Sequence, residues 1–184
     1  MGFISEEVKR LKSGSETALE ECMLKYQDYV YGLLSGMLTR EEAEEAAQDT
    51  FIKVFKSIKT FNGESKFSTW IYRIAYRTGL DYLKKRKTVQ SIDEAMIPEK
   101  TLGIDAKGQK NLERQDVNDQ IDDALSAIPD DQATVLRLFY LSELNLKEVS
   151  EITGLTESNV KVRLFRARKQ LKKQLELNMN FTYH

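Results

Sequence analysis

The chain has 184 residues, and its 28 Lys and Arg against 29 Asp and Glu give a formal net charge of −1. Hydrophobic residues make up 41% of it, enough for packed cores, and the length suits one large domain or two small ones. A single Cys excludes an internal disulfide, and one Cys with one His cannot build a Cys/His zinc site. The one His is His184, at the C-terminus, so a Ser-His-Asp triad has no plausible His.

These exclusions disfavour an enzyme, and no Gly-rich phosphate loop occurs, so we expect no catalytic residue, no metal and no cofactor. No stretch is apolar enough to cross a bilayer, and residues 1–12 lack the apolar core of a signal peptide. We therefore expect a cytoplasmic protein without membrane insertion.

The charge is unevenly distributed along the chain. Residues 1–65 carry a net −4, residues 66–87 +6, residues 88–133 −7 and residues 134–184 +4. Such blocks are compatible with ordinary solvated helix faces. Two compact basic segments in an otherwise acidic chain also attract phosphate, because local fields rather than net charge govern that attraction.

Helical periodicity dominates the first third of the chain, and no strand is evident. Ser15 is a suitable N-cap for a helix whose apolar residues recur every three or four positions up to Met37. A capping-box pattern at Thr39 and Glu42 opens a second helix. After the break at Asn62-Gly63, we expect a third helix from Trp70 to about Arg86, begun by Ser68 or Thr69.

The third helix mixes aromatic and basic residues. Trp70 and three tyrosines alternate with cations, and Arg73, Arg77 and Lys84 share one face with Asp81. This combination suits single-stranded DNA, whose bases stack on rings while its phosphates need countercharge. The alternative is that Trp70 and Phe67 belong to the core.

Periodicity fades over residues 88–112, which contain Pro98 and Gly103. We interpret this stretch as a flexible acidic linker between a first domain, residues 1–87, and a second, residues 113–184. Helices resume with apolar positions from Val117 to Ile128 and again over about Asp131 to Leu141. The predicted fold class is all-α, with two small helical domains joined by a flexible linker.

The second domain contains a helix-turn-helix pattern. Asn145 is a good N-cap with Glu148 three residues later, Gly154 suits the left-handed end of that helix, and Thr156 caps a longer helix from Glu157. Such a unit presents its second helix to the major groove of DNA. Lys and Arg on the outer side of the longer helix would neutralise phosphates.

Phe165 lies off the apolar stripe of the longer helix, so we expect its ring to be exposed, as for contact with a thymine methyl. The alternative is that it packs on a neighbouring helix.

Three segments together resemble the extracytoplasmic-function, group 4 sigma factors of bacterial RNA polymerase. They are EAEEAAQDTF from Glu42, FSTWIYRIA from Phe67, and VKVRLFRAR from Val160. The resemblance covers both domains. It implies a non-enzymatic factor that directs core RNA polymerase to specific promoters and helps to melt the minus-ten element, with promoter DNA, core polymerase and an anti-sigma factor as partners.

The resemblance also assigns roles to residues. Those expected to read the minus-thirty-five element are Ser158, Asn159, Lys161, Val162, Arg163, Phe165, Arg166, Arg168 and Lys169. Those expected to contact the minus-ten element, including a base flipped out of the duplex, are Phe61, Asn62, Lys66, Phe67, Ser68, Trp70, Arg73, Arg77 and Lys84. Those expected to contact polymerase are Glu45, Gln48, Asp49 and Phe51.

Two positions depart from the family pattern. Arg77 stands where many relatives have Asn. Because Arg cannot accept a hydrogen bond, the identity of the base that the minus-ten loop captures is left open. Val162 stands where relatives frequently have a small residue with a hydroxyl side chain.

Two other functions compete with the sigma-factor interpretation. One is a helix-turn-helix regulator that binds duplex DNA without polymerase, and the other is an Asp/Glu-Mg²⁺ enzyme acting on nucleic acid. The aromatic-basic helix counts against the former, and the lack of a compact carboxylate cluster in the sequence counts against the latter.

Overall fold

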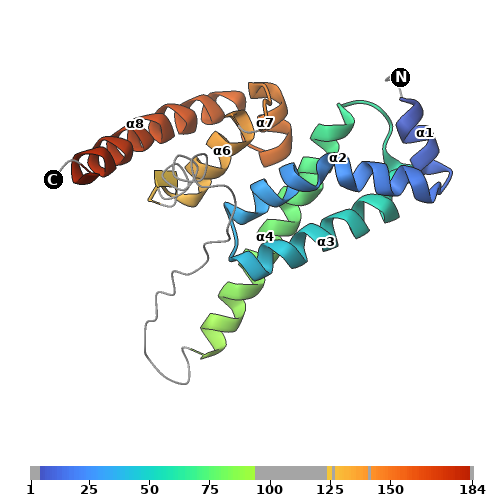
Figure 1. The fold of residues 1–184 in the computed structure, drawn as a ribbon, viewed down its shortest axis with the longest axis horizontal. Coiled ribbons are helices and arrows are strands. Elements are labelled where there is room, and N and C mark those ends of the chain that lie inside the picture. Colours follow the sequence, from blue (N-terminus) through green and yellow to red (C-terminus); the bar gives the residue numbers. More distant parts are fainter. Residues whose placement is uncertain (1–4, 94–123, 126, 141, 183–184) are drawn as a thin grey trace.

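The computed structural model describes residues 5–93, 124–125, 127–140 and 142–182, and every regular element among them is helical (Figure 1). The elements in chain order are α1 (Glu6–Lys12), α2 (Glu16–Ser35), α3 (Arg40–Ser57), the short 3-10 helix η1 (Ile58–Thr60), α4 (Phe67–Asp93), α6 (Asp130–Tyr140), α7 (Leu146–Thr153) and α8 (Glu157–Thr182). The all-α prediction is confirmed. No helix in these ranges is both long and apolar enough to span a membrane.

Side-chain caps fix the starts of α2 and α3. Ser15 Oγ accepts a hydrogen bond from the Ala18 N–H at the start of α2, and Thr39 and Glu42 form the predicted reciprocal capping box on α3. Capping of this kind satisfies backbone donors that a helix leaves unpaired. Both predicted helix starts are confirmed.

Helix α1 was not predicted. Most of its residues are charged, and its apolar side consists of Val8 and Leu11, each only 1% exposed. Ser5 caps it, and the helix packs against α2 and η1. Seven residues are too few for periodicity alone to reveal a helix, and packing decides the outcome here.

Helix α4 is longer than predicted at both ends. It begins at Phe67 rather than Trp70 and runs to Asp93, so residues 88–93 of the predicted linker are helical. The remainder of that linker lies outside the described residues. So does most of the helix predicted around Val117 to Ile128, although Leu125 and Ile128 are described and buried.

The helix-turn-helix forms as predicted. Asn145 and Glu148 make a capping box on α7, and Gly154 ends that helix with a φ of 74°. Glycine adopts this left-handed backbone without the steric cost that a Cβ would add. Thr156 Oγ1 then accepts a hydrogen bond from the Asn159 N–H at the start of α8.

The two helical halves lie against each other. A single buried cluster includes Val30, Phe51 and Ile71 from the first half and Val149 and Leu164 from the second. Helix α7 contacts α4, and α6 contacts α2. The sequence pattern predicts the halves, but not that they share apolar contacts. Their boundaries at residues 87 and 113 stay a prediction.

Candidate nucleic-acid and polymerase surfaces

The outer face of α8 is a basic surface interrupted by exposed apolar side chains. Val160, Leu164 and Ala167 are buried and fix the helix on its neighbours. On the opposite side Val162 is 43% exposed and Phe165 is 69% exposed, so the expectation that the Phe165 ring is exposed is confirmed. The other exposed members of this face are Ser158, Asn159, Lys161, Arg166 and Lys169.

Two arginines of α8 are engaged by α6 instead. Arg163 forms an ion pair with Asp131. The Arg168 guanidinium lies over two rings of α6, 5.7 Å from the centre of Phe139 and 5.4 Å from that of Tyr140. Cation–π contacts of this length stabilise a defined side-chain position. In this arrangement both arginines contact α6, while Arg168 itself stays exposed.

The loop between η1 and α4 is built around a buried ring. Phe61 is 4% exposed and lies 5.3 Å from Phe67 and 5.4 Å from Trp70, measured between ring centres. Tyr26 of α2 meets Phe67 edge-on at 5.9 Å. The burial of Phe61 argues against the predicted direct contact with DNA. Phe67 and Trp70 are half-buried in the same cluster, in line with the core alternative.

Beyond Phe61 the loop is held by its own polar groups. Asn62 Oδ1 accepts a hydrogen bond from the Glu64 N–H at 3.2 Å, and Gly63 has a φ of 78°. A turn closed by an Asn side chain gives the loop a fixed backbone. Asn62 is itself exposed, so its predicted contact with minus-ten DNA stays a prediction.

The predicted cations of α4 and its loop differ in their surroundings. Arg77, Lys84 and Lys66 are exposed, and Arg73 is half-buried. Lys66 Nζ lies 2.8 Å from Glu148 Oε1, and Arg73 Nη2 lies 3.5 Å from Glu151 Oε2. Ser68 is half-buried. Lys66 and Arg73 thus contact α7, the first helix of the helix-turn-helix.

Glu148 is the most enclosed acidic group of this contact, with a side chain 10% exposed. Burial acts to raise its pKa, but hydrogen bonds from the Lys66 ammonium and the Asn145 N–H outweigh burial and leave the pKa below its ordinary value. Glu148 is therefore ionised at neutral pH and balances Lys66.

The predicted polymerase residues lie on α3. Glu45 and Gln48 are exposed. Asp49 accepts a hydrogen bond from the Tyr82 hydroxyl at 3.0 Å. Burial, and to a smaller extent this hydrogen bond, raises the pKa of Tyr82 to about 12. Phe51 is 4% exposed in the core, so its side chain does not reach the surface and the predicted contact is not supported.

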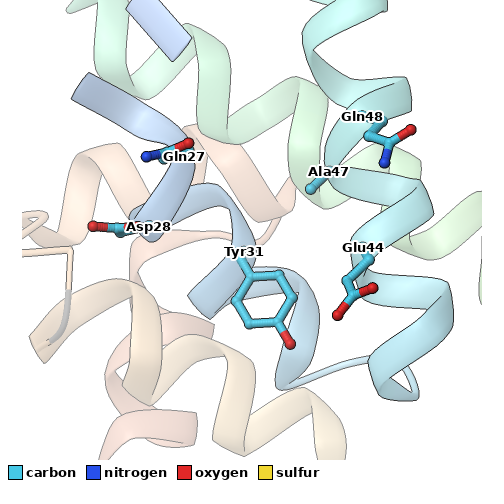
Figure 2. A pocket seen from close by; sticks show the side chains of 6 residues that line it. All are labelled: Gln27, Asp28, Tyr31, Glu44, Ala47 and Gln48. Carbon is cyan, nitrogen blue, oxygen red and sulfur yellow. The ribbon is translucent and has the colours of Figure 1, made fainter. Parts of the chain in front are cut away.

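An open pocket of about 410 Å³ lies between α2 and α3. Gln27, Asp28 and Tyr31 line it from α2, and Glu44, Ala47 and Gln48 line it from α3. Figure 2 shows the Tyr31 ring directed toward α3, near Glu44. The α2 residues were not predicted from the sequence, although they fall on the side of α2 opposite its buried stripe. The pocket combines two carboxylates with amide and hydroxyl groups, which suits a basic partner.

Comparison with known proteins gives two family matches. The Sigma-70 region 2 family matches residues 22–89, and the Sigma-70, region 4 family matches residues 118–171. All residues predicted to contact polymerase or the minus-ten element fall in the first range. All those predicted to contact the minus-thirty-five element fall in the second.

Similar proteins extend over nearly the whole chain. The ECF RNA polymerase sigma factor SigW of Bacillus subtilis (strain 168) is 33% identical over 181 residues, covering 94% of this chain and 97% of SigW. The ECF RNA polymerase sigma-E factor of Haemophilus influenzae is 28% identical over 176 residues, covering 92% of this chain and 93% of that protein.

A solved structure shares the fold. The sigma factor RpoE, co-crystallised with the anti-sigma factor NepR from Bartonella quintana, superposes with a TM-score of 0.70 at 20% identity. The similarity covers 85% of this chain and 96% of that one.

Proposed function

This chain belongs to the extracytoplasmic-function sigma factors of RNA polymerase, which act in transcription initiation, and we propose that three of its surfaces divide promoter recognition among them. The observation that carries the proposal is the outer face of α8. Basic side chains surround an exposed Phe165 there, on the second helix of a helix-turn-helix. We assign this face to the minus-thirty-five element in the major groove.

The second surface is the exposed part of α4 and its preceding loop, assigned to the minus-ten element. Arg77 and Lys84 supply countercharge for phosphates. Lys66 and Arg73 join them once they are released from α7. Phe67 and Trp70 pack against the Phe61 ring and so stabilise the loop. Phe61 shapes the loop rather than touching DNA, because its ring is buried. Asn62 closes the loop through its Oδ1, and because its side chain is exposed it is kept as a DNA contact.

The third surface is the α2–α3 pocket and the adjoining acidic face of α3, assigned to core polymerase. Glu45, Gln48 and Asp49 are retained as contacts, and Asp28 and Tyr31 are added. A basic helix or loop of polymerase would place its cations near Glu44 and Asp28. Gln48 and Tyr31 would supply hydrogen bonds.

Three further points complete the proposal. The chain has no catalytic activity of its own, acts in the cytoplasm, and is restrained by an anti-sigma factor. The RpoE–NepR complex supports the last point, since an anti-sigma factor is bound there to a protein of the same fold. Tethering two weak DNA-binding surfaces in one chain makes the second contact intramolecular, which raises the overall affinity for a promoter.

Reconstitution with core RNA polymerase on fragmented genomic DNA, followed by sequencing of the transcripts, tests the proposal. We expect the chain to bind core polymerase and to yield transcripts whose start sites share two upstream elements. A chain that neither binds core polymerase nor changes the set of start sites would overturn it. A chain that shifts start sites without an upstream element in common would overturn the assignment of α8.

A further inference from the structure

Asp81 is an acidic residue on the basic side of α4, and none of the three proposed surfaces gives it a role. Residues 66–87 contain seven Lys and Arg but only this one carboxylate. Its side chain is 72% exposed, and it lies about one turn after Arg77 and one turn before Lys84 on the same face of α4. A carboxylate among cations that face DNA repels phosphate, so phosphate is not its partner there.

Lys53 of α3 holds Asp81 from the side. Helices α3 and α4 pack against each other (Figure 1). The Lys53 ammonium donates a hydrogen bond of 3.1 Å to Thr78 Oγ1 and lies 3.4 Å from Asp81 Oδ2. Thr78 is fully buried, so its hydroxyl gives the ammonium a fixed anchor. The Asp81 carboxylate is therefore oriented by a side chain of the neighbouring helix.

This ion pair contributes little to the stability of the fold. The side chains of Lys53 and Asp81 are 46% and 72% exposed, and pairs so accessible to water add little stability. Stability therefore does not explain why an acidic side chain lies on this side of α4.

The chemistry of a carboxylate restricts what it can recognise on DNA. A carboxylate accepts hydrogen bonds but has none to donate. In the major groove, the amino group of cytosine is the donor that Asp and Glu side chains recognise. Adenine also presents an amino group there, but beside it lies the N7 acceptor, which a carboxylate cannot satisfy. Cytosine is therefore the base that fits an oriented carboxylate best.

We propose that Asp81 is a specificity-determining residue, which accepts a hydrogen bond from the amino group of one cytosine in the paired part of the minus-ten element, and that Lys53 is its positioning residue. The inference rests on the proposed assignment of α4 to that element. It adds a base preference, which the phosphate contacts assigned to Arg77 and Lys84 cannot supply.

Asp81→Asn tests the base contact, because it keeps the size of the side chain but exchanges one acceptor for a donor. An Asn side chain pairs bidentately with adenine. The measurement is transcription by core polymerase with the chain from promoter duplexes whose minus-ten element is randomised, followed by sequencing of barcoded transcripts. We expect wild type to prefer cytosine at one position, and Asp81→Asn to lower the cytosine-to-adenine ratio there by roughly tenfold and to leave the other positions unchanged.

The matched control is Glu64→Gln, which removes the same charge at an exposed position of the loop before α4. This variant should raise transcription from all sequences alike, because it only lessens the repulsion of phosphate. The same uniform gain in Asp81→Asn, or an unchanged base preference, would overturn the base contact. Weaker binding of Asp81→Asn to labelled core polymerase would also overturn it, since Asp81 would then contact polymerase.

Lys53→Met tests the positioning residue, with Lys56→Met at another exposed position of α3 as its control. We expect Lys53→Met to weaken the same cytosine preference about threefold and to leave thermal unfolding nearly unchanged. A full cytosine preference in Lys53→Met would overturn the positioning role. If wild-type chain selects no minus-ten element, the proposed function fails. If it selects one in which no position responds to Asp81→Asn, only the present inference fails.

Discussion

The Lys12 ammonium donates a 2.6 Å hydrogen bond to the backbone carbonyl of Phe61, which ties the end of α1 to the start of the loop before α4. The bond is partly buried, and it acts at the residue from which the loop departs. Lys12 is therefore a positioning residue for the proposed minus-ten loop, 49 positions away in the chain.

Lys12→Met keeps the length of the side chain but loses the donor. We expect promoter opening, measured by permanganate reactivity of unpaired thymines, to fall about three- to tenfold, since a hydrogen bond of this kind contributes roughly 0.5–1.5 kcal/mol. Core binding should not change. The control is Lys9→Met on the same helix, whose partner is the exposed Glu6. Equal losses in both variants would remove the positioning role.

Arg166 is exposed on the outer face of α8, beside Phe165. Arg166→Ala should cost about 1–3 kcal/mol of minus-thirty-five binding and relax the preference at one base pair, as expected for bidentate contact with a guanine. Selection of bound duplexes from a random library, followed by sequencing, measures both effects. The control is Lys173→Ala, further along α8. An equal loss of affinity for all sequences would show that Arg166 contacts a phosphate rather than a base.

Asp28 of α2 and Glu44 of α3 both line the α2–α3 pocket. Reversing one charge by Asp28→Lys should weaken core polymerase binding by roughly tenfold, because it sets a cation against a basic partner. The change should leave thermal stability nearly unaltered, since Asp28 is exposed. Titration of labelled core polymerase with Asp28→Lys and with Glu20→Lys checks this. Equal affinities would exclude the pocket from the polymerase contact.

Replacing Gly154 or Gly32 by Ala should change the stability of the fold in opposite directions, because the two glycines differ in backbone conformation. A Cβ at Gly154 meets nothing within 4 Å, but the φ of 74° makes Gly154→Ala unfavourable by about 1–2 kcal/mol. Gly32 lies within α2 and also has open space, so Gly32→Ala should stabilise the fold by about 0.5–1 kcal/mol. Thermal unfolding followed by circular dichroism gives both values. A Gly154→Ala variant as stable as wild type would contradict the left-handed turn.

Cys22 is fully buried, and burial, with a smaller contribution from Glu7, raises the pKa of its thiol from 9.0 to about 12. A pKa raised on folding favours the protonated, folded state, so this contribution is present below pH 9 and is lost between about pH 9 and 12. At pH 8 we expect native chain to resist alkylation and urea-unfolded chain to react at once. A cysteine introduced at the exposed Ser35 is the positive control. Rapid alkylation of native Cys22 would contradict its burial.

Local sequence determined the starts of α2, α3 and α7, whereas α1 and the ends of α4 were not predicted. Ser15, Thr39 and Asn145 each cap the helix that their spacing predicts, because a cap depends only on residues within three positions of it. The turn at Gly154 is local in the same way. The exposed Phe165 followed from its place off the apolar stripe of one helix.

Tertiary structure decided which residues of different helices and loops contact one another. Nothing near Lys66 in the sequence predicts its pairing with Glu148, and nothing near Phe61 predicts that its ring is buried or that Lys12 holds its carbonyl. Such contacts join residues tens of positions apart, and they form only when helices pack. The sequence by itself therefore determined which surfaces carry charge and aromatic rings. Only the packing of α7 on α4 decided that two of the predicted DNA-binding cations are paired within the chain.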